Sequence, residues 1–258
     1  MKRLFNALAL GFAVITAGGS AHADLFNDLK SALTTTNSPA SAISSLSQEQ
    51  VVGGLKEALS LGVSNAVASL GRNDGFLTNL NVKIPMPGKL QSVEKALRLA
   101  GQGQTVESFI GSMNHAAEQA VPVAAGVFGD AISQMTMADA KAILTGTNDA
   151  ATMYFRRTTQ TNLFAKFYPV VQQATDRVGV TAEYKAMMAK FSSVNTLGSM
   201  FGKSSPGRLD AADIDTYVTH KALDGLFKMV AVEERSIRAN PAARTTELLK
   251  TVFGSAAK

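Results

Sequence analysis

The sequence contains no cysteine along its 258 residues. Disulfide bonds, thiolate nucleophiles and a lipid-modified N-terminal cysteine are therefore excluded. An exported chain without disulfides depends on its packed core for stability. This chain is long enough to bury one sizeable core, and no linker within it demands a second domain.

Histidine is also scarce, and the familiar catalytic motifs are missing. Beyond the first residues only His115 and His220 remain, with no HExxH spacing, so no zinc site is expected. The sequence has no GxSxG, GxxxxGK[ST] or GxGxxG, which leaves a serine hydrolase or a nucleotide-binding protein without support. Asp210, Asp213 and Asp215 lack the glycine and distal glutamate of a calcium loop and suit a helix start better. We expect no metal and no cofactor.

The N-terminus has the three regions of a secretory signal peptide. Lys2 and Arg3 precede an apolar stretch over 4–17, which is too short to span a membrane. Ala21-His22-Ala23 then offers the small residues that signal peptidase reads, so the mature chain is expected to begin at Asp24. We therefore predict a periplasmic location. No later run of 18 apolar residues occurs, and no transmembrane span is expected.

The positive charge does not indicate a nucleic-acid partner. The whole chain has a formal net charge of +5, and loss of Lys2 and Arg3 with the leader leaves +3. The remaining lysines and arginines are scattered, whereas a nucleic-acid binder usually gathers them on one face.

The stretch over 105–135 predicts the central helix of an all-α domain. Its apolar residues recur every three or four positions and form one broad helical face, which needs partners on several sides. Pro122 interrupts this stretch, because it has no N–H for the helical ladder and its ring clashes with the Glu118 carbonyl. We expect a kink or a break there.

These features predict one domain with flanking segments. Residues 1–23 are the signal peptide, 24–46 a loose lead-in and 47–254 a single all-α domain containing a mobile loop over 192–211. Residues 81–87 alternate polar and apolar side chains around two prolines, and are the only credible extended segment.

Two further prolines predict helix boundaries. A helix over 148–167 is expected to end before Pro169, which would begin the next segment. A second long helix over 213–239 is expected to stop at Asn240-Pro241, and a last helix to follow.

Glu233 is the most unusual charged residue in the predicted helices. It falls within the apolar face of the helix over 213–239, where a lone carboxylate would be costly to bury. Arg157, which flanks the Tyr154 and Phe155 face of another helix, is the expected partner. A buried ion pair or an exposed last turn is favoured over a catalytic or ligand-binding Glu233.

Asn114 and Glu118 form a second polar pair, four residues apart on the flank of the central helix. Pro122 frees the carbonyl of Glu118, so polar groups converge there. Packing and capping are favoured, and the floor of a polar pocket is the functional alternative. His115 points away from the apolar face and is expected to be solvated.

Seven segments resemble an exported bacterial family of uncharacterised proteins, domain of unknown function 4197. They are GLKEAL (54–59), NDGF (73–76), KIPMP (83–87), SMNHAAEQAVP (112–122), DAATMYFRR (149–157), YVTHKALDGLF (217–227) and IRANPAARTTELL (237–249). The resemblance covers most of the mature chain and implies a helical exported domain without implying an activity. The family commonly has other residue types at His115 and His220, which implies that neither histidine is essential.

Three functions remain open on these grounds. The leading one is a non-enzymatic binding or assembly module of the cell envelope, with an envelope protein or a small apolar ligand as partner. An envelope enzyme using Glu118 or Glu233 as general acid or base is the alternative, and a structural homo-oligomer is the third. The candidate ligand-binding residues are Asn114, Glu118, Arg157 and Glu233.

Overall fold

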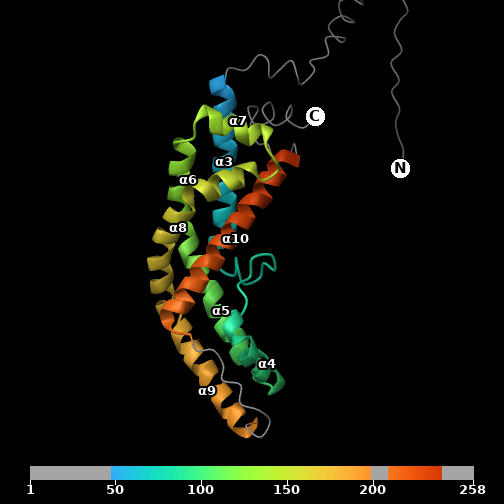
Figure 1. Cartoon of the computed structure of the whole chain (residues 1–258), viewed down its shortest axis with the longest axis vertical. Coiled ribbons are helices and arrows are strands. Elements are labelled where there is room, and N and C mark those ends of the chain that lie inside the picture. Colours follow the sequence, from blue (N-terminus) through green and yellow to red (C-terminus); the bar gives the residue numbers. More distant parts are fainter. Residues whose placement is uncertain (1–47, 199–208, 240–258) are drawn as a thin grey trace, which may run out of the picture.

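The protein is helical throughout the part of the chain that the structure describes. The structure is a computed structural model describing residues 48–198 and 209–239, and these residues contain no strand (Figure 1). The α-helices are α3 (Gln48–Gly71), α4 (Gln91–Leu99), α5 (Gly103–Ala120), α6 (Ala124–Ser133), α7 (Met137–Thr145), α8 (Ala150–Arg177), α9 (Val180–Gly198) and α10 (Ala211–Ala239). Two 3₁₀ turns are also present: η1 (Gly88–Leu90) leads into α4, and η2 (Val121–Val123) joins α5 to α6. The predicted all-α class is confirmed.

The helices form an elongated, bent bundle. The long helices α8 and α10 pack against each other, and α3 packs on α10 (Figure 1). α4 and α9 flank α5 at the lower end of the bundle in Figure 1, while α7 lies near α3 at the upper end. None of the helices in the described part of the chain combines the length and the apolar character that crossing a bilayer requires.

The predicted central helix lies in the core and breaks at Pro122. α5 ends at Ala120, the residues around the proline form η2, and α6 begins at Ala124. Apolar residues on both sides of the break are fully buried, including Phe109, Met113 and Phe128. The predicted interruption is confirmed, and it lets one continuous apolar stripe change direction within the core.

Pro169 does not end a helix as predicted. α8 runs without interruption from Ala150 to Arg177 and contains this proline. Phe167 and Val171 on either side of it are fully buried, so packing keeps the helix continuous although the proline supplies no N–H.

The predicted loop over 192–211 begins too early, because α9 continues to Gly198. Phe191 is buried and Val194 packs against the core, which favours helix in this stretch. Residues 199–208, the signal peptide, the lead-in and the helix expected after Pro241 lie outside the described residues.

Candidate functional site

Glu118 is a buried carboxylate that holds a turn of the backbone. Its side chain accepts hydrogen bonds from the N–H groups of Asp74 (3.1 Å), Phe76 (2.9 Å) and Leu77 (3.3 Å). The turn needs this support because Asp74 has a φ of +60°, which is unfavourable for residues other than glycine. Glu118 thus fixes the chain that leaves α3.

Asn114 fixes the segment over 81–87 by hydrogen bonds to its backbone. Its amide oxygen accepts from the N–H of Ile84 (2.8 Å), and its amide nitrogen donates to the carbonyl of Ile84 (2.9 Å). The nitrogen also donates to the carbonyl of Ile110 (2.7 Å). A fully buried side chain therefore takes the place of a neighbouring strand for Ile84, whose segment is irregular.

His115, predicted to be solvated, is solvated only in part. Its side chain is 36% exposed, and its Nδ1 lies 2.9 Å from a Glu118 carboxylate oxygen. Its Nε2 lies 4.0 Å from the Asp74 carboxylate. The imidazole therefore covers the polar cluster that Glu118 forms with the turn.

The predicted contact between Glu233 and Arg157 is wrong. Glu233 accepts a hydrogen bond from the Asn65 amide nitrogen (3.1 Å), whereas an Arg157 nitrogen lies 3.3 Å from the Asp139 carboxylate. The side chain of Arg157 is 70% exposed. Glu233 and Arg157 therefore have different partners and lie at different places on the surface.

The buried acid of α10 is the next residue, Glu234. Its carboxylate accepts from the N–H groups of Ala151 and Thr152 (both 2.9 Å) and from the Thr152 hydroxyl (2.8 Å). An Arg238 nitrogen lies 3.0 Å away, and the side chain of Arg238 is 12% exposed. Glu234 thus caps the N-terminus of α8 from another helix, where free N–H groups and the helix dipole favour a carboxylate.

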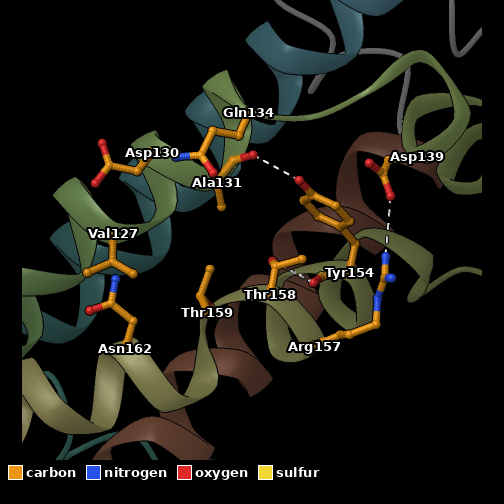
Figure 2. A pocket seen from close by; sticks show the side chains of 10 residues that line it. All are labelled: Val127, Asp130, Ala131, Gln134, Asp139, Tyr154, Arg157, Thr158, Thr159 and Asn162. Atoms are coloured by element: carbon orange, nitrogen blue, oxygen red, sulfur yellow. Dashed lines mark hydrogen bonds and ion pairs between the residues drawn. The ribbon is translucent and has the colours of Figure 1, made fainter.

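Arg157 lies at the edge of an open cleft between α6, α7 and α8. The cleft has a volume of about 350 Å³ and is lined mainly by polar side chains (Figure 2). Its lining residues are Val127, Asp130, Ala131, Gln134, Asp139, Tyr154, Arg157, Thr158, Thr159 and Asn162. Tyr154, Thr158 and Asn162 follow one another at four-residue spacing, so they form a row along α8.

One end of the cleft is closed by hydrogen bonds. The Tyr154 hydroxyl donates to the Ala131 carbonyl (2.9 Å) and bridges α8 to α6, as Figure 2 shows. Burial raises the pKa of this hydroxyl, and the nearby Asp139 carboxylate raises it further. Tyr154 therefore stays neutral at physiological pH.

Asp139 orients the arginine at this end. One of its oxygens accepts from the Thr136 hydroxyl (2.6 Å) and N–H (3.2 Å), which completes the capping box of α7. Its other oxygen faces Arg157 (Figure 2). The side-chain hydrogen bond from Thr136, supported by its N–H and by Arg157, lowers the pKa of Asp139, so this carboxyl group is ionised at neutral pH.

The remaining polar groups of the cleft are free to meet a ligand. Gln134 and Asn162 are exposed, and neither side-chain amide has a hydrogen-bond partner within the described residues. The Asp130 carboxylate is exposed at the rim of the cleft, and it too has no hydrogen-bond or ion-pair partner among the described residues. Of the residues that line the cleft, the sequence analysis identified only Arg157 as a candidate for ligand binding. The four-residue spacing of Tyr154, Thr158 and Asn162 is the sequence signal that could have indicated the site.

A second groove lies beside the segment over 81–87. It has a volume of about 400 Å³, and Leu80 at its edge is 90% exposed. Its charged groups are already paired: Arg98 lies 2.9 Å from Glu94 and 2.7 Å from Glu107. The apolar spaces next to Leu59 measure only about 10 Å³, too small for a ligand.

Metal binding has no geometric support in the described part of the chain. Residues 48–198 and 209–239 contain no group of three histidine, aspartate or glutamate side chains arranged to hold an ion.

The fold and the site define an all-α protein whose buried polar side chains fix irregular backbone and whose open cleft presents free polar groups. The family model described as "Protein of unknown function (DUF4197)" matches residues 45–254. The chain therefore belongs to the DUF4197 family, as the seven sequence segments indicate. No curated protein and no solved structure matches it.

Proposed function

We propose that this protein is an exported, non-enzymatic binding module of the cell envelope, and that the cleft between α6, α7 and α8 is its binding site. One contrast carries the proposal. The buried carboxylates of Glu118 and Glu234 accept hydrogen bonds from backbone N–H groups of the protein itself. The side-chain amides of Gln134 and Asn162, in contrast, are exposed in a concave surface and have no hydrogen-bond partner among the described residues. Unpartnered polar groups that converge in a cleft are typical of a binding site.

The titratable groups of the cleft favour binding over acid–base catalysis. A general acid or base works best when its pKa lies near the operating pH. The pKa of Asp139 is lowered and that of Tyr154 is raised, so both groups are moved away from neutrality. Fixed in one protonation state, they serve to orient Arg157 and to close the cleft.

The polar lining also changes the expected ligand. The sequence suggested a small apolar ligand, whereas this cleft is lined mainly by polar side chains. The cleft of about 350 Å³ suits a small hydrophilic ligand or the end of a polymer. Periplasmic export, inferred from the leader, would place this site among envelope components.

Export is tested by the intact mass of the protein recovered from the periplasmic fraction. The proposal expects a chain that begins at Asp24, cleaved after Ala21-His22-Ala23. A full-length chain that retains Met1 and is found only in the cytoplasmic fraction would contradict export.

Binding is tested by native mass spectrometry of protein purified directly from the periplasm. Thr158→Leu fills the middle of the cleft, and Thr161→Leu makes the same change at an exposed position on α8 outside it. We expect a non-covalent adduct on the wild type and on Thr161→Leu, and its loss from Thr158→Leu. A wild type without any adduct, or an adduct that survives Thr158→Leu, would refute this site.

A further inference from the structure

The chemistry of the cleft changes along its length, from the Arg157–Asp139 ion pair to neutral polar groups on α8, and this asymmetry constrains its ligand. A cation, Arg157, lies at the end closed by Tyr154, while the neutral groups of Thr158 and Asn162 continue along α8 toward the open end (Figure 2). From this we infer that the cleft binds the C-terminal end of a short extended peptide, with the terminal carboxylate on Arg157. The inference rests on the proposed binding function and specifies its ligand.

The Arg157 guanidinium is exposed and has N–H donors available for an anion. Its hydrogen bond to Asp139 is long, at 3.3 Å, the guanidinium carbon lies 5.8 Å from the centre of the Tyr154 ring, and the Arg157 side chain is 70% exposed. A guanidinium has five N–H donors, so most of them remain available to a second carboxylate. The Asp139 carboxylate, which faces Arg157, accepts a hydrogen bond from the Thr136 hydroxyl. This bond holds the carboxylate in place and so orients the guanidinium.

The row on α8 sets the length of the ligand. Tyr154 and Asn162 are eight residues apart, which is about 12 Å along a helix that rises 1.5 Å per residue. An extended peptide advances about 3.3 Å per residue, so three to four residues would run from the Tyr154 end of the cleft, where the Arg157 guanidinium lies, to Asn162. A single amino acid would leave the amides at the open end unused.

The neutral groups favour a peptide over a sugar. The only aromatic residue among those lining the cleft is Tyr154, which is 7% exposed and whose hydroxyl is bonded to Ala131. It has little free ring surface for a sugar to stack on. Gln134 and Asn162 each offer one donor group and one acceptor group, the pattern that matches the C=O and N–H of a peptide unit.

The other wall of the cleft is apolar and almost closed. Val127 and Ala131 of α6 face the row on α8 across the cleft, and both are buried apolar residues at four-residue spacing. Val127 is 2% and Ala131 is 9% exposed, so this wall offers no pocket for a side chain, and the peptide is expected to be held by its backbone and its carboxylate.

The experiment is equilibrium dialysis of the mature protein against a randomised tetrapeptide library, read by mass spectrometry. One library has free C-terminal carboxylates and the other has the same sequences with C-terminal amides. Arg157→Gln removes the proposed anchor, and Arg235→Gln removes the same charge from an exposed position on α10 outside the cleft. Because both positions are exposed, neither change should affect folding.

We expect the wild type and Arg235→Gln to retain peptides from the acid library, and to bind the matching amides about 10- to 100-fold more weakly. Arg157→Gln should lose the same factor for the acids and change little for the amides. Equal retention of acids and amides, or equal loss in both arginine variants, would overturn the inference.

Failure of this inference is distinguishable from failure of the proposed function. If neither library is retained while the protein from the periplasm carries a non-peptide adduct that Thr158→Leu removes, the peptide assignment is wrong and the binding function stands. If neither library is retained and no adduct is found, both are wrong.

Discussion

Asn114 satisfies both backbone groups of Ile84, a residue 30 positions earlier in the chain. Ile84 is fully buried and lies in an irregular segment, so no neighbouring strand or helix provides these hydrogen bonds. One amide side chain therefore allows a buried segment without regular structure to pack against α5. Glu118, one helical turn further along, does this for the turn around Phe76.

The first prediction concerns this clamp. Asn114→Ala leaves the N–H and the C=O of Ile84 buried without partners, which should lower the free energy of unfolding by about 2–4 kcal/mol. Urea denaturation followed by circular dichroism measures the loss. Asn162→Ala, the same change at an exposed position, should stay within about 0.5 kcal/mol of the wild type. Equal effects of the two changes would show that Asn114 has no special role.

The second prediction compares two adjacent glutamates on α10. Glu234→Ala removes the cap of α8 and the carboxylate beside the largely buried Arg238, and should cost about 3–5 kcal/mol of stability. Glu233→Ala removes one exposed hydrogen bond to Asn65 and should cost about 0.5 kcal/mol or less. The midpoints of urea unfolding of the two variants test this order, and a reversed order would contradict it.

The third prediction concerns a glycine in the middle of α10. A Cβ at Gly225 would lie 2.6 Å from a ring carbon of Phe76 and 3.2 Å from the Val82 Cβ. Phe76 is fully buried and held by Glu118, so it has little room to move. Gly225→Ala should therefore destabilise by about 1–3 kcal/mol, although alanine is the better helix former.

Two other helical glycines provide the control for this substitution. Gly126 and Gly129 of α6 have no atom within 4 Å of an added Cβ. Alanine at either position should raise the stability by up to about 1 kcal/mol, because only helix propensity changes there. Thermal unfolding should show a lower melting temperature for Gly225→Ala and a higher one for Gly126→Ala and Gly129→Ala. A stabilised Gly225→Ala would contradict the close approach of Phe76.

The fourth prediction concerns the pH dependence of stability. Burial raises the pKa of Asp215, with Asp176 and Asp210 adding to it, although Thr175 donates a hydrogen bond to the carboxylate. Because the folded state holds this proton more tightly than the unfolded chain, the Asp215 contribution to stability falls as pH rises through the two pKa values. It is fully present only below the unfolded value of about 3.9.

Asp215→Asn removes this penalty and keeps an oxygen for Thr175. The variant should gain stability relative to the wild type at pH 7, and the gain should shrink as the pH falls toward 3. Urea unfolding over this range measures the difference. A stability difference between Asp215→Asn and the wild type that stays constant over this pH range would refute the argument.

The sequence predicts those features of this fold that depend on local chemistry. Pro122 lacks an N–H wherever it lies in a helix, so the break between α5 and α6 follows from the residue itself. Pro169 has the same chemistry in α8, yet the helix continues, because the neighbouring Phe167 and Val171 are anchored in the core. Tertiary packing decides between these outcomes, and a single sequence does not contain it.

The buried acid of α10 likewise depends on packing that the sequence does not show. The sequence identifies α10 as a helix with an acid on its apolar face. Counting Met229 as part of that face selects Glu233, four residues further on, but Met229 is only half-buried in the structure. The buried neighbours Val230 and Ile237 place Glu234 on the inner face instead, since one residue turns a helix by about 100°. The cleft could not be predicted, because it arises where three separate helices meet.

The most direct test of the account is hydrogen–deuterium exchange of the protein purified from the periplasm. It is compared with the same protein after its ligand has been removed by unfolding and refolding. The account predicts that the protein with its ligand exchanges more slowly in peptides from α6 and the first half of α8, with α3 unchanged. Identical exchange in the two samples, or slower exchange confined to the groove beside Leu80, would contradict it.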